Sequence, residues 1–150
     1  MEIRKATWKD LADVVKLLAD DQLGSKREMY QLPLPEVYQS AFEKILADDN
    51  QELMVLCDET GVVIGTMQLS FIQYLTYKGG VRAQIEAVRI AKEKRGEGLG
   101  KHMFRWAIDR AKERKAHVMQ LTTDKLRPEA LKFYEKLGFK ASHEGMKLHL

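Results

Sequence analysis

The stretch Arg95–Gly100, which reads Arg-Gly-Glu-Gly-Leu-Gly, is the feature that most restricts how this chain can fold. Its three glycines stand at alternate positions, and a long amphipathic segment follows them from Leu99 to Lys115. Glycine tolerates positive φ and lets the backbone approach a ligand closely. A helix that begins just after such a loop adds unpaired N–H groups and the positive end of its dipole. The pattern therefore predicts an anion site, most often for phosphate, at a helix N-terminus.

Two common phosphate-binding motifs do not fit this stretch. Gly100 and Lys101 would supply the G-K pair of a P-loop, but that motif needs glycine where Arg95 stands and a hydroxyl residue where His102 stands. The Rossmann fingerprint needs its last glycine where Lys101 stands. The pattern that fits is [RQ]-x-x-G-x-[GA], with Arg95, Gly98 and Gly100 as the matched residues.

The flanking segments extend this match. A predicted strand with Glu86 and Val88 precedes the loop, and Ala130-x-x-Phe133-Tyr134-Glu135-x-x-Gly138-Phe139 follows the helix. Residues 82 to 140 together resemble the GNAT acetyltransferase superfamily, whose members bind the pyrophosphate of acetyl-CoA at such a loop. The resemblance implies a mixed, mostly antiparallel sheet flanked by helices. It also implies acetyl-CoA as the acyl donor.

Composition predicts one domain spanning residues 1–150, of mixed α/β class. The chain is 45% hydrophobic and 31% charged, values typical of a globular protein. No apolar run approaches the roughly 18 residues that a membrane span requires, and the N-terminus lacks the apolar core of a signal peptide. The single cysteine, Cys57, cannot form an internal disulfide and suits a reducing compartment. We therefore expect a cytoplasmic protein without a membrane partner.

Positive charge is concentrated around the glycine loop. Residues 89 to 115 hold ten Lys or Arg and four acidic residues, which leaves the rest of the chain at −3. This distribution suits a polyphosphate ligand. Nucleic acid is the alternative, but some of the segment's cations favour the C-terminal end of the helix dipole. We therefore expect no nucleic-acid partner.

Hydrophobic periodicity predicts the element order β-α-α-β-β-β-α-β-α-β. The predicted strands are Glu2–Lys5, Leu53–Cys57, Val62–Tyr74, Arg82–Ile90, His117–Thr122 and Phe139–Leu150. The predicted helices run from a Thr7 cap to Ala19, from Pro35 to about Asp48, from Leu99 to Lys115 and from Arg127 to Leu137. Asp10 would complete a capping box with Thr7, and Gly138 is a candidate left-handed C-cap. The polar segment 20–35 is long for a loop in a small domain, and such loops are often functional.

One predicted strand contains a break in its alternation. Ala83, Ile85 and Ala87 are apolar at alternate positions, but Val88 and Ile90 are apolar in the opposite phase. Such a slip moves later side chains to the other face unless an extra residue is absorbed. The pattern predicts a β-bulge near Ala87 and Val88, although burial of both faces would explain it as well. The GNAT fold has a bulge here, with the pantetheine arm of acetyl-CoA in the gap beside it.

The resemblance gives the residues that we expect to bind the acyl donor. Main-chain groups of Val88 and Ile90 would meet the pantetheine arm. Backbone N–H groups of the glycine loop would bind the pyrophosphate; these belong to Arg95, Gly96, Glu97, Gly98, Leu99, Gly100 and Lys101. Arg127 stands where family members often carry asparagine, so its cofactor contact is a departure from the pattern. The four histidines show no metal-ligand spacing, and we expect no metal.

Two residues are candidates for proton transfer. An alkyl amine with a pKa near 10.4 is neutral only about once in 2500 at pH 7, so a base must help it react. Glu86 lies on the polar face of its strand, and many GNAT enzymes carry a glutamate there that acts directly or through water. Tyr134 matches the position of the family's general acid, and a phenol stays protonated at pH 7 and can donate to a thiolate. An ion-paired surface carboxylate and an amphipathic core tyrosine are the alternatives.

These features predict an N-acetyltransferase in which a primary amine attacks acetyl-CoA directly in a ternary complex. Cys57 lies outside the motif region, which argues against an acyl-enzyme. The alternative from another class is a non-catalytic acyl-CoA-binding or sensor module, which would not need Glu86 or Tyr134. The acceptor amine should lie against residues 20–35 and the strand beginning at Val62. Family members often form homodimers, so a homodimer is a possibility.

Overall fold

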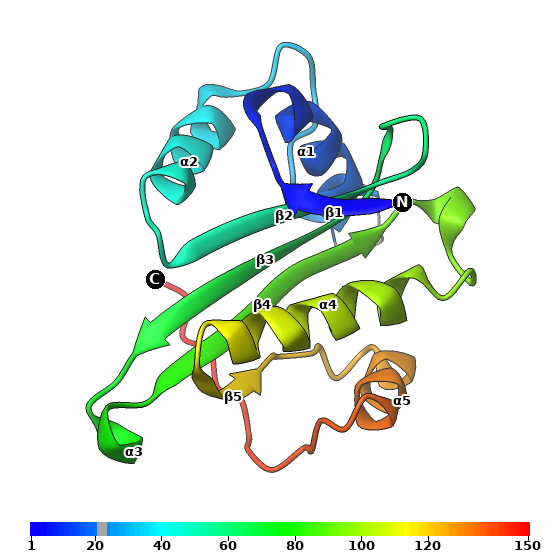
Figure 1. Cartoon of the computed structure of the whole chain (residues 1–150). Coiled ribbons are helices and arrows are strands. Elements are labelled where there is room, and N and C mark those ends of the chain that lie inside the picture. Colours follow the sequence, from blue (N-terminus) through cyan, green and yellow to red (C-terminus); the bar gives the residue numbers. More distant parts are fainter. Residues whose placement is uncertain (21–23) are drawn as a thin grey trace.

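The computed structural model describes residues 1–20 and 24–150. A five-stranded sheet with the order β1-β2-β3-β4-β5 forms its centre (Figure 1). The strands are β1 (Glu2–Lys5), β2 (Gln51–Cys57), β3 (Val63–Gln73), β4 (Val81–Ile90) and β5 (Ala116–Gln120). The first four pair antiparallel, and β5 pairs parallel with β4. The predicted mixed, mostly antiparallel sheet is confirmed.

Helices cover both faces of this sheet. They are α1 (Leu11–Ala19), α2 (Glu36–Leu46), α3 (Thr76–Gly79), α4 (Leu99–Glu113) and α5 (Pro128–Lys136), with 3₁₀ turns at Trp8–Asp10, Gly24–Lys26 and Lys92–Lys94. Helices α1 and α2 lie on one side, and α4 crosses the other (Figure 1). No helix in the described part of the chain is long and apolar enough to span a membrane.

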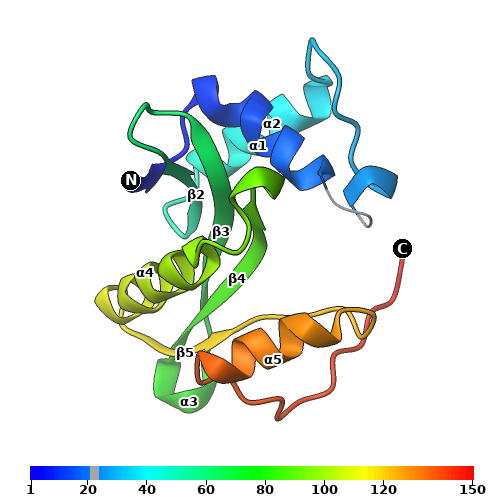
Figure 2. The ribbon, with the colours of Figure 1, turned by 90° about the vertical axis from the view of Figure 1, so that its right-hand side faces the viewer.

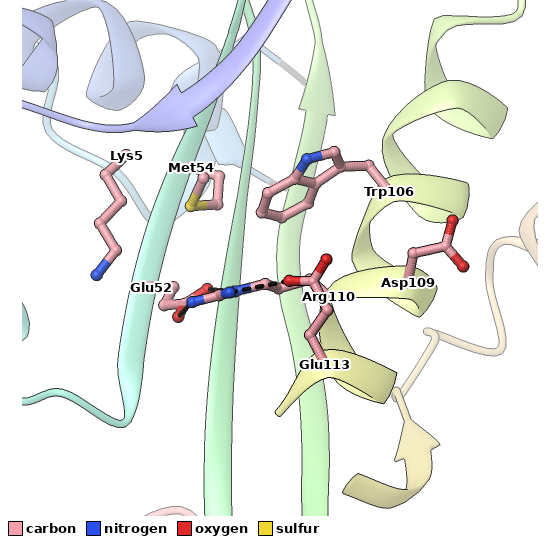
Figure 3. Close-up of a pocket in the computed structure, with 7 residues that line it drawn as sticks. All are labelled: Lys5, Glu52, Met54, Trp106, Asp109, Arg110 and Glu113. Carbon is pink, nitrogen blue, oxygen red and sulfur yellow. Dashed lines mark hydrogen bonds and ion pairs between the residues drawn. The ribbon is translucent and has the colours of Figure 1, made fainter. Parts of the chain in front are cut away.

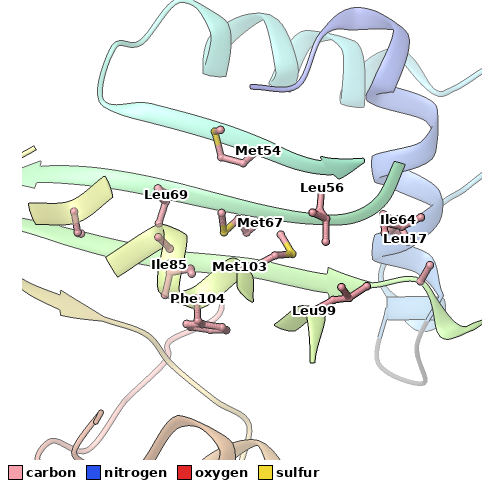
Figure 4. Packing of buried hydrophobic residues seen from close by; sticks show 14 of the residues in the cluster. Leu17, Met54, Leu56, Ile64, Met67, Leu69, Ile85, Leu99, Met103 and Phe104 are labelled. Atoms are coloured by element: carbon pink, nitrogen blue, oxygen red, sulfur yellow. The ribbon is translucent and has the colours of Figure 1, made fainter. Parts of the chain in front are cut away.

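Strand alternation divides the core into two layers. Met67 and Leu69 of β3 face α4, where they meet buried Met103 and Phe104 (Figure 4). The opposite face of β2 packs against α1 and α2, through the set Leu53, Val55, Cys57, Val14, Val15 and Phe42. Cys57 is buried in this layer, as its position in a strand predicts. The sheet is therefore fixed from both sides, and α4 is held firmly against it.

The first helix begins at a buried carboxylate. Asp10 accepts hydrogen bonds from the Thr7 N–H at 2.7 Å and from the Thr7 hydroxyl at 2.8 Å, which completes the predicted capping box. Arg4 of β1 binds the same carboxylate through two nitrogens, at 2.7 and 2.9 Å. The hydrogen bond from Arg4 is the main reason that the pKa of Asp10 falls from 3.8 to about 2, although burial opposes the shift.

We expect Asp10 to make stability fall in acid. A depressed folded-state pKa contributes stability above the unfolded value near 3.8, and this contribution is lost as pH falls toward 2. It amounts to about 2 kcal/mol at most. Urea unfolding of wild type and Asp10→Asn should differ by this amount at pH 7 and converge near pH 2. An equal difference at both pH values would contradict the assignment.

The predicted strand over Phe139–Leu150 is wrong, because none of these residues lies in a strand. Met146, Leu148 and Leu150 alternate with polar residues, which suggested a half-buried strand, but their side chains are almost fully exposed. The tail meets the segment after β5 through an exposed Lys125–Glu144 ion pair at 3.7 Å. Local alternation alone does not make a strand when no neighbour buries its apolar side.

Candidate active site

The predicted β-bulge is present in β4. Thr66 of β3 pairs with Arg89, and Gln68 pairs with Glu86, so Met67 alone faces both Ala87 and Val88. Ala87 has a φ of 55°, a left-handed conformation that is uncommon for a residue with a side chain. The extra residue lets both apolar phases of the strand be accommodated, and it changes the direction of the backbone that follows.

Strand β4 separates from β5 just before this bulge. Their pairing runs only from Val81 with Ala116 to Gln84 with Gln120. From Ile85 to Ile90, β4 has no strand partner on this side within the described part of the chain. Figure 2 shows the chain after β5 diverging from β4 toward α5. We call this opening the β4–β5 splay. On its β5 side, β4 carries main-chain groups there that make no hydrogen bond to a neighbouring strand of the described chain.

The glycine loop leads directly into α4. Gly96 and Gly98 have φ values of 90° and 80°, and a Cβ at either would meet no atom within 4 Å. The first intrahelical hydrogen bond runs from the His102 N–H to the Gly98 carbonyl at 3.1 Å. The N–H groups from Leu99 to Lys101 therefore have no acceptor within the helix. This open loop with N–H groups and a helix dipole fits a phosphate ligand.

Other side chains of the loop hold it in place. Arg95 donates to the Ile90 carbonyl at 3.0 Å and to the Asp20 carbonyl at 3.1 Å, which ties the loop to the ends of β4 and α1. Leu99 is buried in the core below α4, whereas Glu97 and Lys101 are exposed. Of the predicted loop residues, Arg95 and Leu99 thus have structural contacts of their own, and the main chain stays available for a ligand.

Glu86 lies on a polar area of the sheet. It is exposed, and its Oε1 accepts a hydrogen bond of 2.7 Å from Gln84 Nε2. The strand registers place further polar side chains on this same face, namely Gln51, Gln68, Ser70 and Gln120. On β3, Gln68 and Ser70 share Gln51 Oε1 as acceptor. The polar face therefore extends from Glu86 to β3, the strand where the acceptor is expected. The other segment expected to meet the acceptor, residues 20–35, includes residues 21–23, which lie outside the described part of the chain.

Tyr134 lies on α5 among aromatic side chains. Its ring contacts Phe104, Phe133 and Phe139, with centroid separations of 5.4, 5.5 and 6.2 Å. Burial raises the pKa of its phenol, the charges of Arg127 and Arg89 lower it, and Glu86 raises it further. The net pKa is raised, so the phenol keeps its proton at neutral pH. Glu86 and Arg127 thus lie within electrostatic range of Tyr134. Three of the predicted site residues are therefore near enough to influence one another through their charges.

Two site residues were missed by the sequence analysis. Arg89 follows the bulge, acts on the Tyr134 phenol and donates to the Val88 carbonyl at 2.9 Å. Gln120 of β5 donates to Gln84 Oε1 at 2.7 Å. Arg89 lies inside the basic segment, but nothing in a single sequence separates it from its neighbours. Gln120 requires the parallel β4–β5 register, which local periodicity does not provide.

A surface pocket lies away from this site, between β2 and the C-terminal half of α4. Its lining is Lys5, Glu52, Met54, Trp106, Asp109, Arg110 and Glu113 (Figure 3). Glu52 is 1% exposed and binds Arg110 at 2.9 and 2.6 Å, so the pocket is built around a satisfied ion pair. Within residues 1–20 and 24–150, no group of three or more His, Cys, Asp or Glu is arranged to hold a metal ion.

Known proteins share both the sequence pattern and the fold. Residues 17–139 match the acetyltransferase (GNAT) family. An aminoalkylphosphonate N-acetyltransferase of Salmonella typhimurium is 27% identical over 95% of this chain and 86% of its own length. The match thus includes the bulged strand, the glycine loop and the segment with Tyr134.

Solved structures agree with this result. A Bacillus halodurans protein described as a transcriptional regulator has 54% identity and a TM-score of 0.96, covering 99% of both chains. A Clostridium acetobutylicum protein described as a predicted acetyltransferase, crystallised with acetyl-CoA, has 26% identity and a TM-score of 0.75, covering 99% of this chain and 95% of its own. The chain therefore belongs to the GNAT family of acetyltransferases.

Proposed function

We propose that residues 1–150 form a single GNAT domain that transfers an acetyl group from acetyl-CoA to a primary amine. The observation that supports this most is the β4–β5 splay, which opens beside the N-terminus of α4. A main-chain edge next to a helix N-terminus offers one ligand both amide hydrogen bonds and a phosphate site. Acetyl-CoA combines an amide-containing arm with a pyrophosphate, so its two parts suit the two surfaces.

Each part of the acyl donor then has its own group of residues. The loop from Arg95 to Lys101 would bind the pyrophosphate through backbone N–H groups, because the positive φ of Gly96 and Gly98 leaves this side open. The β5-facing edge at Val88 and Ile90, which no strand in the described chain pairs with, would hold the pantetheine arm. Arg127 caps α5 and acts electrostatically on Tyr134, and we assign it to a phosphate of the donor. Acetyl-CoA supplies the activated acyl group.

Glu86 and Tyr134 would supply the two proton transfers. The Glu86 carboxylate is exposed and hydrogen-bonded, so it can accept a proton from the incoming ammonium group directly or through water. The Tyr134 phenol, whose pKa is raised mainly by burial, stays protonated and can protonate the leaving thiolate. The Val88 N–H beside the bulge is our candidate donor to the thioester oxygen.

The acceptor is proposed only as a class, a primary amine that lies on the polar face next to Glu86. The Salmonella relative is named for an aminoalkylphosphonate, which is an amine with an anionic group. Aminoalkylphosphonates are therefore the first acceptors to test, together with amino sugars, amino acids and peptides. Glu86 would attract the cationic amine in each case.

One observation favours a second candidate, a sensor that binds acyl-CoA without turnover. The Bacillus relative with 54% identity is described as a transcriptional regulator. A sensor would retain the glycine loop and the splay, but it would make no use of the Glu86 carboxylate or the Tyr134 hydroxyl. Acetylation assays and binding assays on the same preparation separate the two candidates.

The test of the proposal is CoA release from acetyl-CoA in the presence of this amine panel. We expect Glu86→Gln to lower kcat/KM about ten- to a hundredfold, because the amide cannot accept the proton. The acidic limb of the kcat/KM profile should disappear in the variant, whereas acetyl-CoA affinity should stay unchanged. Binding of acetyl-CoA without CoA release from any amine would favour the sensor, and an unchanged rate in Glu86→Gln would exclude this base.

A further inference from the structure

A chain of three hydrogen bonds leads across β4 and β5 to Glu86. Arg82 Nη1 donates to Gln120 Oε1 at 3.2 Å, Gln120 Nε2 donates to Gln84 Oε1 at 2.7 Å, and Gln84 Nε2 donates to Glu86 Oε1 at 2.7 Å. Gln84 and Gln120 are also the last register pair before the splay. This chain of hydrogen bonds therefore ends on the Glu86 carboxylate, just past the point where β4 loses its pairing with β5.

The chemistry of the two ends determines the direction of every bond in this chain. A guanidinium group can only donate hydrogen bonds, and an ionised carboxylate can only accept them. The side-chain amides of Gln120 and Gln84 lie between these ends, and each uses one donor and one acceptor. Both amides must therefore present their oxygen toward Arg82 and their nitrogen toward Glu86. A turned amide would place oxygen against oxygen or nitrogen against nitrogen. The arrangement is thus self-consistent when Glu86 is ionised.

The distant end of the chain is fixed by aromatic rings. The Arg82 guanidinium carbon lies 4.7 Å from the ring centroid of Tyr74 and 5.9 Å from that of Tyr77. Tyr77 in turn stacks on His117 of β5, with 4.9 Å between the centroids. These contacts hold the arginine without further acceptors, so it can orient Gln120.

We propose that Arg82, Gln120 and Gln84 form a positioning relay that holds the Glu86 carboxylate at the splay in one orientation, ready to accept a proton. An exposed glutamate otherwise samples many rotamers, and fixing its side chain removes an entropy cost from each proton transfer. This inference rests on the proposed function, in which Glu86 is the base. None of the three relay residues needs to touch the reacting atoms.

Carbon-13 NMR of the Glu86 side chain tests the relay without any turnover, because the carboxyl chemical shift reports the hydrogen bond and the relaxation of the γ-carbon reports side-chain mobility. Gln84→Met removes the hydrogen bond to the carboxylate, and Gln120→Met frees the Gln84 amide to turn; neither adds a charge. We expect the Glu86 carboxyl to change its chemical shift and its γ-carbon to become more mobile in the first variant, and to a smaller extent in the second. Gln51→Met is the matched control, since it removes an amide from the same face that has no bond to Glu86.

Other charged or titratable groups near this carboxylate stay constant in all these variants. Tyr134 of α5 interacts with Glu86, and Arg89 and Arg127 act on the same phenol. An identical Glu86 chemical shift and mobility in wild type, Gln84→Met and Gln120→Met would overturn the relay, as would an equal change in Gln51→Met. If Gln84→Met does not fold, Gln120→Met alone gives the answer.

Kinetics separates failure of the relay from failure of the proposed function. If Glu86 is the base and the relay positions it, kcat/KM should fall in both relay variants, by less than in Glu86→Gln. A kcat/KM that Glu86→Gln lowers but the relay variants leave unchanged would overturn only the relay. A rate that Glu86→Gln leaves unchanged would overturn the base assignment, and with it the catalytic purpose of the relay.

Discussion

Replacement of Glu52 by glutamine should lower the free energy of unfolding by about 3 kcal/mol. The Glu52 carboxylate is buried on β2, where Arg110 binds both of its oxygens and Arg114 donates to Oε1 at 3.2 Å. Burial raises the pKa of Glu52, but the hydrogen bond from Arg110 and neighbouring cations lower it more, so the group is ionised when folded. Glutamine would leave Arg114 without its carboxylate partner and Arg110 with only the exposed Glu113, which it binds at 3.0 Å.

The expected loss is at the lower end for a broken buried ion pair, because the arginine side chains remain 29% and 28% exposed and can reach water. Urea unfolding measures it. Asp109→Asn is the matched control on α4, since its pair with Lys112 is about 70% exposed and should be worth less than about 0.5 kcal/mol. A loss of under 1 kcal/mol for Glu52→Gln would show that the Glu52 pair (Figure 3) does not fasten α4 to β2.

The second large effect is expected from Tyr134→Phe, which should reduce kcat about 100- to 1000-fold. The substitution removes the hydroxyl proposed to protonate the leaving thiolate but retains the ring, which packs against Phe104, Phe133 and Phe139. Thermal stability and acetyl-CoA affinity should therefore change little. Because the pKa of this phenol is raised, mainly by burial, wild type should lose rate through its deprotonation only at a higher pH than an ordinary tyrosine would cause.

Tyr77→Phe provides the control for removing a phenol. Its ring is exposed and stacks on His117, a contact that phenylalanine preserves. Steady-state rates of CoA release for the two variants decide the matter. A Tyr134→Phe rate within threefold of wild type would assign the tyrosine to the aromatic core alone, as an amphipathic core residue.

Features that depend on neighbouring residues were predictable from the sequence. The change of phase between Ala87 and Val88 placed the bulge correctly, because a half-buried strand cannot change its apolar face without absorbing a residue. The spacing of Thr7 and Asp10 gave the capping box, and Gly138 has the left-handed φ expected after α5. These features have their causes within a few residues of sequence.

Features that depend on distant residues were not predictable. The relay needs Gln84 next to Gln120, which are brought together by the parallel pairing of β4 and β5 across α4. The tail after Phe139 has the alternation of a strand but no partner to bury it. In both cases the deciding term is contact between segments far apart in sequence, which a local pattern does not contain.

Calorimetric titration with acetyl-CoA tests the central claim, that the glycine loop and the splay form an acyl-donor site. We expect one molecule to bind per chain. Gly98→Ala should bind at least tenfold more weakly, because alanine is strained at a φ of 80° and the loop must change shape. Gly100→Ala is the control, since its Cβ would meet only Phe133 at an ordinary 3.6 Å. Absence of binding to wild type, or equal affinity of Gly98→Ala and wild type, would contradict the account.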